Sequence, residues 1–334
     1  MASRISRFQK ILRNKQIDVA LVKDKSNVLY LTNLKADNGF LIVPRKGKPV
    51  IITSVLDSDN IKGFSKIVYK SKKEKIEIMK EILNGKIGYE SNASVSFLKS
   101  LKKLAKGRFC DIYDDILSLR SVKDKNEVEY IKKATKIANE AFEIAKRGKR
   151  EIEIWKKLKK FFLDNYGDGF CIVQSDENSA GIHKKPSNKK VKSLLLIDIG
   201  PKYKEYITDI TRTFIIKKDK TKEKVYNIVL EAQEKAISLI REGVKASDID
   251  KTIRDVFRKY NLERYFLHSS GHGVGLDVHE LPNISEDSKD ILKAGNVLTI
   301  EPGLYFKEKF GIRIEDVILV KKKGYKILSS FIKK

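Results

Sequence analysis

The 334-residue sequence predicts an α/β domain followed by an α+β domain. As far as residue 115, strand-like and helix-like segments alternate, which is typical of an α/β domain. Asp124 and Glu127 then form a capping-box pattern at the start of a long amphipathic helix. Beyond that helix, apolar strand-like runs gather between further long helices. We place the boundary near residue 118, which gives domains 1–118 and 119–334.

The first domain is expected to contain short strands separated by amphipathic helices. Residues 45–48 lie between two apolar runs and favour a hairpin turn, and Ser26 is expected to cap a short helix. The domain has no histidine and no cluster of catalytic residue types, so we expect it to make oligomer contacts or to wall a substrate cleft. The expected strands are 19–23, 39–44, 49–54, 66–70, 86–90 and 108–113, and the expected helices are 5–14, 26–34, 73–83 and 95–105.

The second domain is expected to place long apolar strands at its centre. Residues 205–216 are predicted as one continuous strand, and 311–320 as another. Ser247 and Asp250 are expected to cap the helix that follows them. The other expected strands are 170–175, 194–200 and 297–303, and the expected helices are the one after Asp124, 150–164, 221–241 and 247–260.

Composition narrows the class of protein. The formal net charge is +26, but the lysines are spread along nearly the whole chain, so we interpret them as a solvated surface and expect no specific nucleic-acid partner. No apolar run approaches the ~20 residues that span a bilayer, and we see no secretory signal, so no membrane partner is expected. Cys110 and Cys171 are isolated from each other in the sequence, which favours a reducing, cytoplasmic setting.

Histidines are rare in this chain and are clustered. Three of the four, His268, His272 and His279, lie within the glycine-rich stretch 268–280, and the fourth, His183, lies in a polar loop. Imidazole carries protons near neutral pH and is a common metal ligand. The alternating glycines leave room for another group to approach the backbone. This stretch is therefore a candidate site, although a glycine-rich loop with incidental histidines is the alternative.

Four carboxylates stand within apolar strand-like runs, where an isolated charge would cost several kcal/mol to bury. With one neutral histidine, they form a hard ligand set that suits manganese, cobalt, iron(II) or zinc. Their four negative charges match two divalent metal ions, which predicts a dinuclear centre. Strand alternation also predicts that Thr211 is a hydroxyl beside the ligands and that Arg313 orients carboxylates or contacts substrate. The four carboxylates are Asp198, Asp209, Glu301 and Glu315.

Several ordered segments resemble the pita-bread metallopeptidases, in the branch that contains prolidase (Xaa-Pro dipeptidase) and aminopeptidase P. The matching segments are LLLIDIG, YITDITRTF, HSSGHGVGLDVHE, VLTIEPGLYF and GIRIEDVILV, and SNVLYLTN and LRSVKDKNEVEYIKKA resemble the creatinase-like N-terminal domain of that branch. The resemblance covers nearly the whole chain. It implies a creatinase-like α/β domain before an α+β pita-bread catalytic domain.

The resemblance also implies a role for each candidate residue. The metal ligands would be Asp198, Asp209, His272, Glu301 and Glu315. Glu301 would also move protons, His279 would stabilise the oxyanion, and His183 would contact the substrate or leaving group. His268 matches a further pocket histidine of some members, and Arg313 matches the arginine beside the last ligand.

The implied activity is metal-dependent hydrolysis of the peptide bond that precedes proline. The expected cofactors are two divalent metal ions per subunit, most readily manganese or cobalt. The expected substrates are Xaa-Pro dipeptides or short proline-containing peptides, and the expected assembly is a homodimer. A dipeptidase is expected, and an Xaa-Pro aminopeptidase is the alternative, because Asn283 replaces an arginine that several archaeal prolidases use in the dipeptide pocket. A non-catalytic binding protein of the same fold is the alternative from another class.

Overall fold

A computed structural model describes residues 3–105, 107–146, 148–165 and 167–329. The chain divides into two compact units, Met1–Arg120 and Ser121–Lys334. The expected boundary at residue 118 falls within the helix α5 (Tyr113–Ser121), which ends beside this division.

The first unit is built on one mixed six-stranded sheet in the order β4-β3-β2-β1-β5-β6. The expected hairpin is confirmed, because β2 and β3 pair antiparallel around residues 45–48. β1 pairs antiparallel with β2 but parallel with β5. The strands are β1 (Val19–Val22), β2 (Phe40–Pro44), β3 (Val50–Ser54), β4 (Lys66–Tyr69), β5 (Gly85–Tyr89) and β6 (Gly107–Asp111).

Helices complete this α/β unit. Met79 and Leu101, from two of them, pack on the sheet with Leu21 and Ile87 in one buried apolar cluster. The cap expected at Ser26 is wrong: the Asp24 side chain accepts from the backbone N–H of Asn27, so the helix begins one residue earlier. The helices are α1 (Arg4–Asn14), α2 (Lys25–Thr32), α3 (Lys72–Ile82), α4 (Val95–Leu104) and α5, with a short 3-10 turn η1 (Ser58–Asn60).

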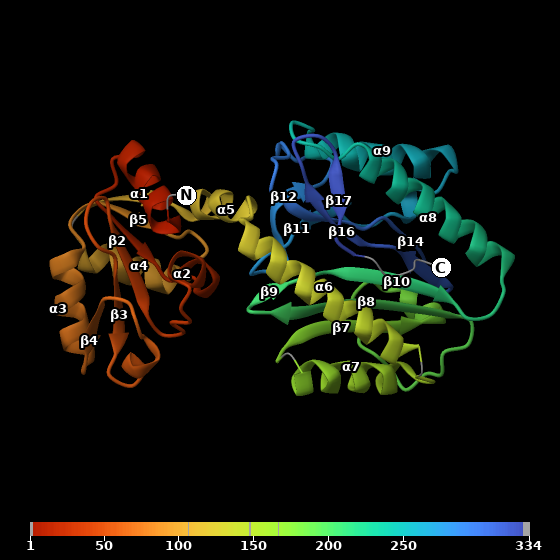
Figure 1. Ribbon diagram of the computed structural model, residues 1–334, viewed down its shortest axis with the longest axis horizontal. Helices are drawn as coiled ribbons and strands as arrows, with labels where there is room; N and C mark the ends of the chain where they lie inside the picture. The colour runs from red at the N-terminus through yellow and green to blue at the C-terminus, as the bar shows by residue number, and fades with distance from the viewer. Residues whose placement is uncertain (1–2, 106, 147, 166, 330–334) are drawn as a thin grey trace. The chain divides into compact units, whose positions relative to one another are not determined.

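The second unit holds its strands between helices (Figure 1). One sheet has the order β10-β8-β7 with β9 attached to β8, another has the order β12-β11-β13-β16-β17, and β14 pairs with β15. The strands are β7 (Gly169–Ser175), β8 (Leu194–Tyr203), β9 (Tyr206–Ile207), β10 (Ile210–Ile215), β11 (Gly271–Gly273), β12 (Glu280–Ile284), β13 (Val297–Ile300), β14 (Gly303–Phe306), β15 (Phe310–Arg313), β16 (Asp316–Val320) and β17 (Tyr325–Ile327).

Two pairs of helices cover these sheets. The predicted capping box is present: Asp124 accepts from the N–H of Glu127, whose side chain accepts from the N–H of Asp124. α6 packs on β8 and α7 on β7. α8 and α9 pack together, α8 also packs on β13, β14 and β15, and α9 packs on β12. The helices are α6 (Lys125–Ala145), α7 (Glu151–Asn165), α8 (Lys220–Ser238) and α9 (Ala246–Lys259), with 3-10 turns η2 (Asp176–Ala180) and η3 (Glu263–Tyr265).

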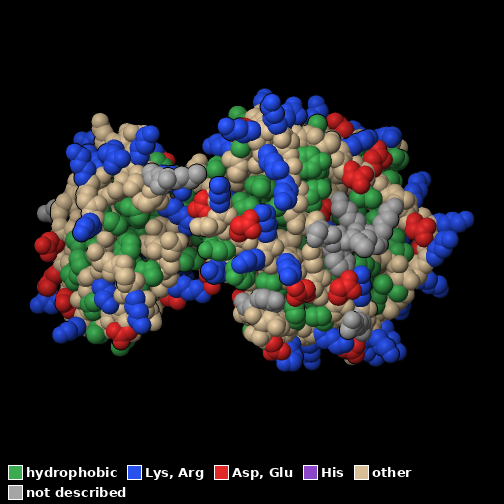
Figure 2. Space-filling model, in the orientation of Figure 1, with side chains coloured by type: hydrophobic (Ala, Val, Ile, Leu, Met, Phe, Trp, Pro, Cys, Tyr) green, Lys and Arg blue, Asp and Glu red, His purple; other side chains and the backbone are tan. Residues whose placement is uncertain are grey.

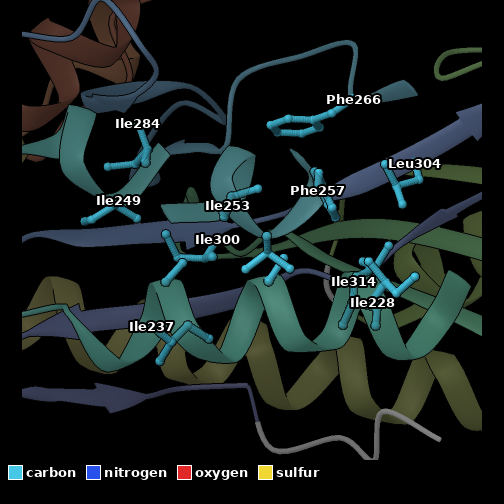
Figure 3. Close-up of a cluster of buried hydrophobic side chains, with 14 of the residues drawn as sticks. Ile228, Ile237, Ile249, Ile253, Phe257, Phe266, Ile284, Ile300, Leu304 and Ile314 are labelled. Atoms are coloured by element: carbon cyan, nitrogen blue, oxygen red, sulfur yellow. The ribbon is translucent and has the colours of Figure 1, made fainter. Parts of the chain in front are cut away.

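A large buried apolar cluster of this unit lies between α8, α9 and the strands. Figure 3 shows Ile228 and Ile237 from α8 facing Ile300 and Ile314, with Ile253 from α9 beside them. All five side chains are buried. This core therefore fixes the strand segments on either side of Glu301 and Glu315.

Three predicted strands in this unit are interrupted. Residues 297–303 are divided between β13 and β14, with a break at Glu301 and Pro302. Residues 205–216 are two strands, β9 and β10, interrupted at Thr208 and Asp209. Residues 311–320 are also two strands, β15 and β16, interrupted at Ile314 and Glu315. Strand-favouring residues flank each break, so the apolar pattern alone did not reveal the breaks.

The expected Ser247–Asp250 cap is wrong as well. α9 begins at Ala246 after Lys245, without a side-chain cap. The Asp250 carboxylate is instead buried, where it accepts from Ser270 Oγ at 2.6 Å and pairs with Arg254. The Asp250 carboxylate therefore binds other side chains instead of capping the helix.

Basic side chains are distributed over the visible face, interspersed with acidic ones, rather than gathered into one stripe (Figure 2). Among the described residues, no helix is both long and apolar enough to cross a membrane.

Candidate metal centre and active site

The predicted ligands converge from five separate segments of the second unit. Asp198 lies within β8 and His272 is the middle residue of β11. The other three lie where strands are interrupted: Asp209 between β9 and β10, Glu301 between β13 and β14, and Glu315 between β15 and β16. At such a break the backbone leaves the ladder, so a side chain can turn toward a point between the sheets.

A cavity of about 590 Å³ is lined by all nine residues that the sequence predicts as catalytic or metal-binding. Apolar side chains, among them Phe170, Ile172 and Leu267, form part of its wall. This combination of a few converging polar groups with an apolar wall is typical of a small-molecule site. The predicted residues on its surface are His183, Asp198, Asp209, His268, His272, His279, Glu301, Arg313 and Glu315.

Three carboxylate oxygens in this cavity are buried without a hydrogen-bond donor among the described residues: Asp198 Oδ1, Asp209 Oδ1 and Glu315 Oε1. Asp209, His272 and Glu315 each offer one atom that could bind a metal ion, and these three atoms lie within 4.8 Å of one another. Buried carboxylate oxygens need donors or cations. The residues therefore fit a site for metal ions.

The electrostatics of the carboxylates point the same way. Burial raises the pKa of Asp209 well above its ordinary value, and repulsion from Glu315 and Asp198 raises it further. Burial likewise raises the pKa of Glu315, with further repulsion from Glu301 and Asp198. Cations would relieve this repulsion, because they stabilise the ionised carboxylates.

His272 presents a lone pair to the carboxylates. Its Nδ1 lies 3.1 Å from the carbonyl oxygen of Gly273, and because a carbonyl only accepts, Nδ1 carries the proton. Nε2 then faces Asp209 Oδ2 at 3.6 Å and Glu301 Oε1 at 3.4 Å. Burial and the neighbouring His279 lower the pKa of His272 to about 4. The ring is therefore neutral near pH 7, as a metal ligand must be.

Glu301 is tuned for proton transfer. Burial raises its pKa to about 8, although the Arg313 guanidinium acts in the opposite direction. A carboxyl group with a pKa near the working pH can both accept and donate a proton. Glu301 therefore has the electrostatic environment of a general acid–base.

Arg313 is a hub of hydrogen bonds. Its Nη2 donates to Asp198 Oδ2 at 2.6 Å, Nε to Thr211 Oγ1 at 3.0 Å, and Nη1 to Tyr305 Oη at 2.8 Å. Thr211 in turn donates to Glu315 Oε2 at 2.8 Å, so its hydroxyl lies beside one of the predicted ligands. The arginine thus connects two predicted ligands, Asp198 directly and Glu315 through Thr211.

Sequence reasoning missed Tyr305. It lies on β14 opposite Gly311, and Gly303 lacks the Cβ that would come 2.6 Å from the tyrosine hydroxyl. The Gly-Leu-Tyr spacing beside Glu301 is the signal that could have found it, since Gly303 and Tyr305 share one face of the strand.

His268 has both ring nitrogens engaged. Nδ1 donates to the carbonyl of Ser269 at 2.8 Å, so Nε2 accepts from the Tyr305 hydroxyl at 2.9 Å. Burial, together with the Arg313 charge, lowers the pKa of His268 to about 3. The ring is therefore a neutral wall of the cavity.

His183 and His279 are exposed where they line the cavity. His279 lies against His272, with ring centroids 4.2 Å apart. Both histidines are placed to meet a bound molecule.

Family models cover almost the whole chain. Residues 129–322 match the metallopeptidase family M24, and residues 4–122 match the creatinase/prolidase N-terminal domain. The chain belongs to metallopeptidase family M24. Its architecture is accordingly a creatinase-like α/β domain followed by an M24 pita-bread catalytic domain, as predicted. Membership in M24 makes it a metallopeptidase that uses divalent metal ions.

Relatives match this M24 chain over its full length. It is 34% identical to an Xaa-Pro dipeptidase of Pyrococcus furiosus, over 98% of each chain. A prolidase of Pyrococcus horikoshii has a similar structure, with a TM-score of 0.93 and 31% identity over 99% of each chain. An X-Pro aminopeptidase of Thermotoga maritima also matches, with a TM-score of 0.90, 29% identity, and coverage of 100% of this chain and 99% of that one.

Proposed function

We propose that this chain is an Xaa-Pro dipeptidase that hydrolyses the peptide bond preceding proline with the help of two divalent metal ions. The observation that carries the proposal is the convergence of four carboxylates and His272 on one cavity. The full-length similarity to Xaa-Pro dipeptidases supports the choice of substrate. Membership in a metallopeptidase family favours catalysis over a non-catalytic binding role.

The metal ions would be held by residues on both sides of the cavity. Arg313 can offset only one of the four carboxylate charges, which leaves a need for further positive charge. Two divalent ions would supply it, would acidify a water molecule and would polarise the scissile carbonyl. The proposed ligands are Asp198, Asp209, His272, Glu301 and Glu315.

Glu301 would handle the proton. Its carboxylate would take a proton from the attacking water and give it to the nitrogen that leaves when the peptide bond breaks. Glu301 Oε1 lies 3.4 Å from His272 Nε2, so its carboxylate lies beside the other proposed metal ligands, where the attacking water would be bound.

His279 would donate a hydrogen bond to the developing oxyanion, a type of contribution worth roughly 3–4 kcal/mol in comparable sites. His183, on the rim of the same cavity, would contact the substrate or the leaving group. His268 would shape the pocket as a neutral wall, and Arg313 would keep Asp198 oriented.

Hydrolysis assays test the proposal directly. Purified protein reconstituted with manganese or cobalt should hydrolyse a Met-Pro dipeptide faster than an Xaa-Pro-Pro tripeptide. Metal analysis of the same sample should give close to two ions per chain. Lack of activity on both peptides, with metal bound, would contradict the proposal.

An Xaa-Pro aminopeptidase is the second candidate. Two observations favour it: the structural match to an X-Pro aminopeptidase, and the exposed Asn283 on β12, which offers no positive charge to a dipeptide carboxylate. Faster cleavage of the tripeptide would decide for this candidate. The substitution Asn283→Arg should then shift the preference toward the dipeptide, with Asn227→Arg, at an exposed position of α8, as its control.

We also propose a homodimer that works in the cytoplasm with manganese or cobalt, with iron(II) or zinc as the alternatives. The free cysteines Cys110 and Cys171 suit a reducing compartment. The oxygen-rich ligand set suits manganese or cobalt. Light scattering after gel filtration tests the dimer, and activity after reconstitution with each single metal tests the metal.

A further inference from the structure

One carboxylate holds the loop that carries His279 from the inside. This loop, residues 274–279, connects β11 to β12. Glu280, the first residue of β12, accepts hydrogen bonds at Oε1 from the backbone N–H groups of Leu276 at 2.9 Å and Asp277 at 3.1 Å. Glu280 is buried. Its carboxylate is therefore a fixed point around which the loop backbone folds.

The glycines of the loop fit this arrangement. A Cβ on Gly275 would lie 2.4 Å from Glu280 Oε2, so the carboxylate occupies the space that a side chain there would need. The loop is also fastened to the strands of the site. Val274 N–H donates to Val297 O at 3.0 Å, and Gly275 O accepts from Ile207 N–H at 2.8 Å.

Lys123 fixes the carboxylate itself. Its Nζ lies 2.9 Å from Glu280 Oε2, and the two side chains are only 1% and 2% exposed. The lysine is anchored by its own backbone, whose N–H donates to Gly295 O at 2.9 Å. Removing one partner of such a buried pair leaves an uncompensated charge, whereas removing both charges is milder. The pair thus ties the His279 loop to the segment that precedes α6.

His279 depends on this support. Its side chain is exposed, so the loop backbone sets where the ring lies, 4.2 Å from the ring of His272. We propose that Glu280, held by Lys123, is a positioning residue that sets the place of the His279 ring in the active site. The link to turnover rests on the proposed function, whereas the effect on the ring position does not.

Variants separate the two contacts of Glu280, one with the N–H groups of the loop and one with Lys123. Glu280→Ala removes the acceptor of the loop N–H groups. Glu280→Asp keeps a partner for Lys123 but withdraws the acceptor by one methylene, and it serves if the alanine variant does not fold. The double variant Lys123→Met with Glu280→Gln removes both charges and keeps an acceptor oxygen for the loop.

Spectroscopy gives a readout that needs no activity. The chain has only four histidines, so histidine-labelled, zinc-supplied full-length protein gives a simple spectrum of ring ¹⁵N signals. The signals that are missing from the spectrum of His279→Ala belong to the His279 ring. Glu280→Ala, or Glu280→Asp, should shift the His279 ring signals and leave those of His183 in place. The double variant should resemble the wild type. Unchanged His279 signals in the alanine or aspartate variant would overturn the proposal.

Kinetics then connect position to turnover. Glu280→Ala should lower kcat on Met-Pro by about tenfold or more, with KM changed by less than about threefold, because a misplaced catalytic group is costly. Metal content should not change. Adding Glu280→Ala to His279→Ala should lower kcat no further, because both substitutions remove the same contribution, that of a correctly placed His279 ring. If the double variant lost kcat by the product of the two single losses, the positioning role would be overturned. A wild type that is inactive on both peptides would contradict only the proposed function, and the ring signals would then decide the positioning role.

Discussion

Arg313 Nη2 lies 2.6 Å from Asp198 Oδ2, and both residues are buried in the wall of the metal-site cavity. The same guanidinium donates to Thr211 and to Tyr305 through its other nitrogens. The planar guanidinium has N–H donors on three sides, so it can bind Asp198, Thr211 and Tyr305 at once. A lysine ammonium at the same place cannot reproduce this fixed arrangement of donors.

Arg313→Lys should therefore lower kcat on an Xaa-Pro peptide by roughly 10²-fold, because Asp198 and Tyr305 lose their common donor. Steady-state kinetics and metal analysis of the same preparation check this. Arg241→Lys, on an exposed arginine, is the matched control and should behave like the wild type. Full activity of Arg313→Lys would show that charge alone suffices.

His272→Ala and His279→Ala should separate metal binding from turnover. His272 faces two carboxylates through Nε2, so its loss should lower the metal content. His279 belongs to the loop beside it and should be dispensable for metal binding but needed for turnover. Metal analysis beside kcat measures both effects. A metal-free His279→Ala protein would contradict this division of roles.

Metal-free protein should lose stability as the pH rises from about 6.5 to 8. Over this range Glu301 of the folded state, whose pKa burial raises to about 8, keeps most of its proton, whereas Glu301 of the unfolded chain has already released it. The unfolded state then binds fewer protons, so the free energy of unfolding falls, by about 2 kcal/mol for one group over 1.5 pH units.

Histidine does not obscure this effect. The lowered pKa values of His268, about 3, and His272, about 4, make stability rise with pH only up to about 6.5, where the unfolded histidines become neutral. Melting temperatures of chelator-treated and metal-loaded protein at pH 6.5 and 8 check the prediction. A chelated protein that melts at a higher temperature at pH 8 would contradict it.

Ile253→Ala should destabilise the second unit by about 2–5 kcal/mol, because it opens a cavity between α8 and α9 in the core of Figure 3. Chemical denaturation followed by circular dichroism measures the change. Ile216→Ala, at a side chain that is 58% exposed, is the control and should cost much less. Equal effects of the two substitutions would contradict this description of the core.

Much of the fold was predictable from local patterns. The capping box of Asp124 and Glu127 is present, and the hairpin around residues 45–48 forms where the turn residues indicate it. These features depend on neighbours in the sequence, which is why propensity and spacing suffice. The expected cap at Ser247 is wrong because the buried Asp250 accepts from Ser270, 20 residues away along the chain, which no local pattern reveals.

By itself, the sequence determined the candidate catalytic and metal-binding residues, although not Tyr305. Carboxylates in apolar runs and clustered histidines are costly to bury without a purpose, and all of the candidates line one cavity. Only the tertiary structure decided how they act together. It interrupts two strands at Asp209 and Glu315, and it brings Tyr305 to Arg313 and Lys123 to Glu280, 157 residues away along the chain. The reason is physical: burial makes a charge expensive, but which distant group compensates it depends on how the strands and loops pack.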